Sequence, residues 1–343
     1  MTVIIILFAI HSTWALGQHY AEDFHALTLA LLQSGNGNMT AQVIRVIPTA
    51  QIHLLRIPKA SSSSLSVVAR RIVGCEPPGP CCKWPGDPPG SCPAKGLFAC
   101  QTEGRVIGCT HHYPNYDALR SPTVVSISIM REPWRRAISA FFYPGIHHNS
   151  KCTAGLEACF REYALSTKWR NVAVKMLTGS YAYEDRAACR HSSPVCQNSL
   201  EAALRNLHHL AFIGVAEMWE LSMCLLHIKM PQLSPMLSEF KLAEKNAGGT
   251  TGAPVTPASI AAKAGGNRIN AGESYQLFKT RALVDPKIQD LLASQSEFDT
   301  ILYQEILSRL CDDLHKYRLW QHPLVRTYWR EKNVGQNLTR CPM

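Results

Sequence analysis

The chain has 343 residues, of which 46% are hydrophobic and 17% are charged. This composition supports a large folded core and excludes a chain that is disordered throughout. Lys and Arg outnumber Asp and Glu by 35 to 25, and the formal net charge of +10 favours an anionic partner, such as a nucleotide, a nucleic acid, an acidic glycan or a membrane surface.

The N-terminus has the features of a secretory signal. An apolar run covers residues 3–10, and small residues follow at Ala15 and Gly17. This arrangement is typical of a signal peptide, and the run is too short to span a bilayer. We predict four parts of the chain, namely a signal peptide or short anchor (1–17), a stem (18–44), one folded domain (45–330) and a tail (331–343).

Within the folded domain, apolar strands alternate with segments of helical spacing. Strands that alternate with helices predict an α/β fold with a central, mainly parallel sheet flanked by helices. Two segments break the pattern, a Cys- and Pro-rich loop at 75–109 and a flexible insertion at 247–272. In chain order, we predict a strand at 52–57, a helix at 63–73, strands at 105–109 and 124–130, a helix at 134–142, a strand at 212–215, a helix at 217–228 and one or two helices over 288–314.

The chain contains 13 cysteines, which is many for a cytosolic protein, whose thiols stay reduced. Six lie in the Cys- and Pro-rich loop and four lie between 152 and 196, so we expect disulfides in both groups. Cys224, on an apolar helix, is our candidate for a buried free thiol. Glycosylation sequons at Asn38 and Asn337 fit the same prediction of a luminal or secreted protein.

The segment after the first predicted strand has the character of an anion-binding loop. Backbone N–H groups at a helix N-terminus attract anions, and a nearby lysine adds a positive charge. The segment lacks the glycines of a Walker A motif, and its serine run offers no acidic neighbour for Mg²⁺. The alternative is a serine-rich loop beside a solvated lysine. The residues of this loop are Lys59, Ala60, Ser61, Ser62, Ser63 and Ser64.

A second candidate anion site follows the strand at 124–130. Arg131 ends this strand, and Ser139 lies eight residues further on, in the next predicted helix. A guanidinium and a hydroxyl placed in this way can bind one anion. The alternative is that Arg131 forms an ion pair with Glu132 and that Ser139 is an ordinary helical residue.

Together, these segments resemble the PAPS-dependent sulfotransferases, in particular the Golgi carbohydrate sulfotransferases related to the heparan sulfate 2-O- and 6-O-enzymes. Residues 57–64 are similar to the family motif for the 5′-phosphosulfate, and 131–141 are similar to the motif for the 3′-phosphate. The segments 212–217 and 298–303 are similar to two later family motifs. The resemblance implies a P-loop-like, three-layer sulfotransferase fold.

The resemblance also implies a reaction. PAPS (3′-phosphoadenylyl sulfate) would donate its sulfuryl group to a hydroxyl of a glycan, with an acidic polysaccharide as the expected acceptor and no metal or nucleic acid involved. Lys59 would also stabilise the leaving oxygen. The expected compartment is the Golgi lumen, with membrane association through the N-terminus or secretion. The residues implied for PAPS binding are Lys59, Ala60, Ser61, Ser62, Ser63, Ser64, Arg131 and Ser139.

The base that removes the acceptor proton is predicted to be a histidine. His112 matches best the histidine-containing segment of the resembling enzymes, because it directly precedes a Tyr-Pro pair. His111 and an acidic residue such as Glu103 are the alternatives. Two other function classes remain open: a nucleotide kinase or NTPase of related fold, and a non-catalytic, cysteine-stapled glycan-binding protein.

Overall fold

The computed structural model describes much of the predicted folded domain and one helix before it. The predicted signal peptide, the insertion at 247–272 and most of the Cys- and Pro-rich loop lie outside the described residues. The described residues are 20–33, 51–55, 57–58, 60–72, 98–100, 105–107, 119, 123–142, 156–178, 194–231, 234–242, 278, 281–282 and 284–332.

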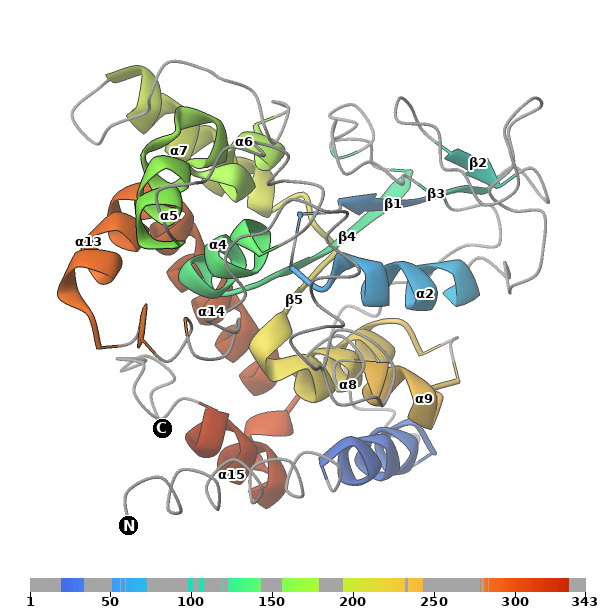
Figure 1. Ribbon diagram of the computed structural model, residues 1–343. Helices are drawn as coiled ribbons and strands as arrows, with labels where there is room; N and C mark the ends of the chain where they lie inside the picture. The colour runs from blue at the N-terminus through green and yellow to red at the C-terminus, as the bar shows by residue number, and fades with distance from the viewer. Residues whose placement is uncertain are drawn as a thin grey trace, which may run out of the picture.

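The described strands form one open sheet in the order β2-β3-β1-β4-β5 (Figure 1). Strand β1 pairs in parallel with β3 and β4, and β4 pairs in parallel with β5. Strand β2 is antiparallel to β3. The predicted α/β class with a mainly parallel sheet is therefore confirmed. The strand bounds are β1 Gln51–Leu55, β2 Phe98–Cys100, β3 Arg105–Ile107, β4 Val124–Met130 and β5 Phe212–Val215.

Helices cover both faces of the sheet. In Figure 1, α2, α8 and α9 lie below the strands, whereas α4 to α7 lie above them. Helix α2 packs against β1 and β4, α8 against β5, and α14 against β5 and α4. The labelled helices are α2 Ser62–Ile72, α4 Pro133–Phe141, α5 Leu156–Leu165, α6 Val172–Leu177, α7 Pro194–Leu207, α8 Trp219–Lys229, α9 Leu237–Phe240, α13 Pro286–Gln295, α14 Glu297–Lys316 and α15 Pro323–Lys332, with short 3₁₀ turns η1 Thr167–Trp169, η2 Ala216–Met218 and η3 Leu319–Gln321.

In the part of the chain that the structure describes, buried side chains form two cores. The larger core includes the sheet, α2, α6, α7, α8, α14 and α15. The smaller core lies between α4, α5 and α13 and is rich in aromatic rings, with Phe141 packed edge-on against Phe160 at 5.1 Å between ring centroids. Within the described residues, no helix is long and apolar enough to cross a membrane.

Helix α8 approaches β5 closely at Gly214. A Cβ atom added at this glycine would lie 2.9 Å from the Cβ atom of Ser222 on α8. The Ser222 hydroxyl, in turn, accepts a hydrogen bond from the Val215 backbone N–H at 2.9 Å. A residue without a side chain at position 214 thus allows the helix to dock directly behind the end of the strand.

Several elements were not predicted from the sequence. Strand β2 lies inside the loop that we expected to be irregular. The helices α5, α6, α7, α9 and α15 were also missed. Within the predicted stem, residues 20–33 form a helix whose Phe24 is fully buried in the larger core, so part of this segment belongs to the folded body.

Candidate functional site

The candidate site lies at the carboxyl ends of β1, β4 and β5. The chain that leaves β1 returns to the sheet on the β3 side, whereas the chain that leaves β4 returns on the β5 side. In open α/β sheets, ligands bind in the crevice where the connections diverge in this way. In this sheet the connections diverge between β1 and β4, next to the two segments that were predicted to bind anions.

The first of these segments forms a tight turn into α2. The Ala60 backbone N–H donates to the Ile57 carbonyl at 3.3 Å. Ser61 has a φ of 59°, which is unusual for a residue other than glycine. Its carbonyl accepts the N–H groups of Ser64 at 3.0 Å and Leu65 at 3.2 Å, so Ser61 is the N-cap of α2.

The first turn of α2 suits an anion electrostatically. It contains no acidic residue, and the first N–H groups of a helix point out of its N-terminus with a partial positive charge. Ser64 is buried. Ser62 and Ser63 are the first two residues of the helix, but their side chains lie outside the described residues, as does Lys59.

The second segment, at the end of β4, is held by a carboxylate from the end of β5. Arg131 Nε lies 3.7 Å from Glu217 Oε1, and the two side chains are 23% and 9% exposed. Glu217 Oε2 accepts hydrogen bonds from the Glu132 backbone N–H at 3.0 Å and from the Tyr303 hydroxyl at 3.2 Å. Burial raises the pKa of Glu217, and the charges of Arg131 and Arg135 oppose that shift.

The alternative partner for Arg131 that the sequence suggested is engaged elsewhere. The Glu132 carboxylate forms an ion pair with Arg135 at 2.6 Å, one helical turn along α4. The Arg135 guanidinium also lies 5.0 Å from the centre of the Trp134 ring. Ser139 lies half-buried on α4, two turns beyond the start of the helix.

The structure thus brings the Ala60–Ser64 turn and Arg131 to the same edge of two adjacent parallel strands. The three candidates for the base, His112, His111 and Glu103, lie outside the described residues. Glu217 and Tyr303 were matched to family motifs, but neither was assigned a role. The feature of the sequence that could have identified them is an acidic or phenolic residue directly next to a buried apolar segment.

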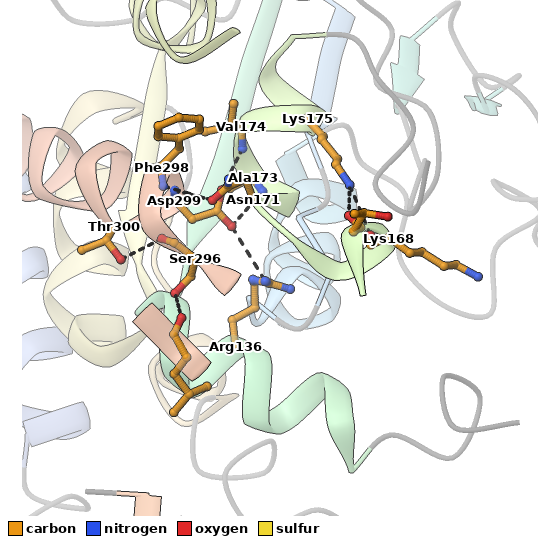
Figure 2. A network of polar contacts seen from close by, with 12 residues as sticks. Arg136, Lys168, Asn171, Ala173, Val174, Lys175, Ser296, Phe298, Asp299 and Thr300 are labelled. Carbon is orange, nitrogen blue, oxygen red and sulfur yellow. Dashed lines mark hydrogen bonds and ion pairs between the residues drawn. The ribbon is translucent and has the colours of Figure 1, made fainter. Parts of the chain in front are cut away.

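A buried polar network lies behind α4 (Figure 2). Arg136 is fully buried, and its Nη2 lies 3.8 Å from Asp299 Oδ2. Asp299 also accepts the backbone N–H groups of Ala173 at 3.2 Å and Val174 at 3.0 Å. In return, Asn171 Oδ1 accepts the backbone N–H groups of Phe298 at 3.0 Å and Asp299 at 3.3 Å. The N-termini of α6 and α14 therefore cap each other.

Two of the described cysteines can be compared with the predicted disulfides and free thiol, and both agree with the prediction. Cys159, from the second predicted group, is in a disulfide, and so is Cys311. Cys224 is a buried free thiol, as predicted. Burial raises its pKa to about 12, which keeps the thiol protonated at neutral pH. The predicted disulfides of the Cys- and Pro-rich loop lie outside the described residues.

Comparisons with known proteins do not assign the chain to a family, since no family model, curated protein or solved structure matches it.

Proposed function

We propose that this protein is a PAPS-dependent sulfotransferase with a P-loop-like, three-layer fold. The observation that carries the proposal is the position of its two candidate anion-binding segments. The turn at Ala60–Ser64 and Arg131 lie at the carboxyl ends of adjacent parallel strands, where the sheet connections diverge. A donor with a 5′-phosphosulfate and a 3′-phosphate presents two anionic groups that match two such segments.

In the proposed reaction, the acceptor hydroxyl oxygen attacks the sulfur atom of PAPS in line with the bond to the bridging oxygen. The new S–O bond forms as the bond between sulfur and the bridging oxygen breaks. The leaving group, 3′-phosphoadenosine 5′-phosphate (3′,5′-ADP), takes the electron pair of the broken bond. His112 takes the acceptor proton, and Lys59 stabilises the charge that develops on the leaving oxygen. The proposed acceptor is a glycan, with an acidic polysaccharide favoured by the net charge of +10.

The proposed compartment is the secretory pathway. The disulfides at Cys159 and Cys311 support it, because disulfides form and persist in oxidising compartments. Cys159 lies on α5 and Cys311 on α14, and both side chains are buried.

The direct test is transfer of radiolabelled sulfate from PAPS to a panel of glycans by the purified full-length protein. We expect labelled product with at least one hydroxyl-bearing glycan. Lys59→Ala is expected to reduce turnover by orders of magnitude, whereas Lys287→Ala, on the exposed side of α13, serves as the matched control. His112→Ala is expected to lower kcat by about 10²–10⁴-fold with little change in affinity for 3′-phosphoadenosine 5′-phosphate (PAP).

ATP consumption, and binding of PAP and of glycan, separate the alternatives. A nucleotide kinase or NTPase would consume ATP and would not transfer sulfate. A non-catalytic glycan-binding protein would bind the glycan without measurable PAP affinity. If His111→Ala, and not His112→Ala, abolishes turnover, the base is His111; if neither does, an acidic residue such as Glu103 takes that role.

A further inference from the structure

The orientation of the Arg131 side chain affects how tightly this residue can bind an anion. An arginine side chain loses conformational entropy when it is fixed, so a guanidinium that is oriented in advance binds an anion more tightly. Arg131 is partly exposed, at 23%, and follows the carboxyl end of β4, next to the point where the sheet connections diverge. Its Nε lies 3.7 Å from Glu217 Oε1, so the ion pair favours orientations in which the guanidinium faces this carboxylate.

The two oxygens of Glu217 have separate partners. Oε1 faces Arg131, whereas Oε2 accepts hydrogen bonds from the Glu132 backbone N–H at 3.0 Å and from the Tyr303 hydroxyl at 3.2 Å. These partners come from the β4–α4 turn and from α14. Because Oε2 accepts two hydrogen bonds from different elements, the orientation of the Glu217 carboxylate is restricted, and Oε1 presents a defined partner to the guanidinium.

A second buried Glu–Tyr pair lies nearby, and its carboxylate has no arginine partner among the described residues. Glu220, one helical turn after Glu217, accepts a hydrogen bond from Tyr328 of α15 in a similarly buried position. Within the described residues, Glu220 forms no ion pair. The Glu220–Tyr328 pair joins α8 to α15, whereas the Glu217–Tyr303 pair joins η2 to α14. Glu217 also contacts the segment that carries Arg131 through the Glu132 backbone N–H.

We propose that Glu217 is a positioning residue that orients the Arg131 guanidinium toward the 3′-phosphate of the donor, and that Tyr303 holds Glu217 in place. This inference rests on the proposed function, since the donor supplies the phosphate. Glu217 does not contact the donor. Its effect on binding of the 3′-phosphate is transmitted through Arg131, and this makes the inference testable.

The test compares binding of PAP with binding of 5′-AMP, because the two ligands differ only in the 3′-phosphate. Glu217→Gln retains the size of the side chain but removes its charge. We expect it to weaken PAP binding by about tenfold, equivalent to about 1.4 kcal/mol, and to leave 5′-AMP binding within about twofold of the unaltered protein. Tyr303→Phe is expected to show the same selectivity with a smaller loss, and it provides a milder variant if Glu217→Gln folds poorly.

Two controls separate positioning from stability. Glu220→Gln and Tyr328→Phe disturb the neighbouring pair and are expected to lower the melting temperature without a selective loss of PAP affinity. In the Arg131→Ala background, Glu217→Gln is expected to cause no further loss, because the residue through which it acts is absent.

The outcomes are distinct. Equal losses for PAP and 5′-AMP in Glu217→Gln, or additive losses in the double variant, would overturn the positioning role while the proposed function stands. If the unaltered protein does not bind PAP, the proposed function and this inference fail together.

Discussion

His53 shows how burial sets the behaviour of a single side chain in the sheet. It lies on β1, is 1% exposed, and its Nδ1 lies 3.1 Å from the Ser126 hydroxyl on the neighbouring strand β4. Its Nε2 has no hydrogen-bond partner among the described residues. Burial lowers the pKa of His53 to about 4, so the ring is neutral at pH 7.

This lowered pKa predicts a pH dependence of stability. The unfolded chain protonates the ring below about pH 6.5, whereas the folded protein does so only near pH 4. The neutral His53 ring therefore causes no loss of stability above about pH 6.5. As the pH falls from about 6.5 to about 4, the free energy of unfolding decreases by about 3 kcal/mol. His53→Gln is expected to flatten this part of the profile in urea unfolding between pH 7 and pH 4.5. The exposed His208 is the control: if His208→Gln flattens the profile equally, burial of His53 is not the cause.

At the scale of elements, α6 and α14 depend on each other for their N-terminal caps. Asn171, which precedes α6, has a φ of 45° and turns its side chain to the start of α14. Asp299, in the first turn of α14, turns its side chain to the start of α6. Each carboxyl or amide oxygen therefore satisfies N–H groups of a helix that is more than a hundred residues away in the sequence.

Asp299→Ala is expected to destabilise the fold by about 3–5 kcal/mol, because the buried Arg136 then loses its carboxylate partner. Arg136→Met in the same chain is expected to restore part of this loss, since the unpaired charge is removed as well. Urea unfolding of the two single variants and the double variant measures the coupling. Strictly additive effects would show that the two side chains do not interact.

At the scale of the whole molecule, the first described helix closes the fold onto the last one. Phe24, in the helix 20–33, packs edge-on against Tyr328 of α15, with 4.8 Å between ring centroids. The Tyr20 hydroxyl donates to Glu331 Oε2 at 2.7 Å. The helix 20–33 thus belongs to the larger core, together with α15 and the sheet.

We expect Phe24→Ala to cost about 3–5 kcal/mol of unfolding free energy, as is usual for a buried aromatic residue. A chain that starts at residue 34 is expected to show a comparable drop in melting temperature. Ala30→Ser, on the exposed side of the same helix, is the control and is expected to leave the melting temperature nearly unchanged. Equal melting temperatures for Phe24→Ala and Ala30→Ser would mean that the helix contributes nothing to the core.

The elements that could be predicted from the sequence are those whose pattern is complete within a few residues. Strands β4 and β5 are buried parallel strands and therefore appear as short, nearly continuous apolar runs. Helix α2 was predicted to within one residue at each end, because its apolar residues recur at helical spacing after the serine run. Strand β2 was missed because three residues within a Cys- and Pro-rich segment carry no periodic signal.

The sequence by itself determined the α/β class, the two candidate anion-binding segments and the buried free thiol at Cys224, because local spacing and side-chain chemistry are enough to define them. Only the tertiary structure decided that Arg131 faces Glu217 and not the adjacent Glu132. It also decided that Asn171 and Asp299 exchange caps and that the helix 20–33 belongs to the core. These pairings depend on the order of strands and on the packing of helices that are far apart in the sequence, and no local pattern of residues encodes that order.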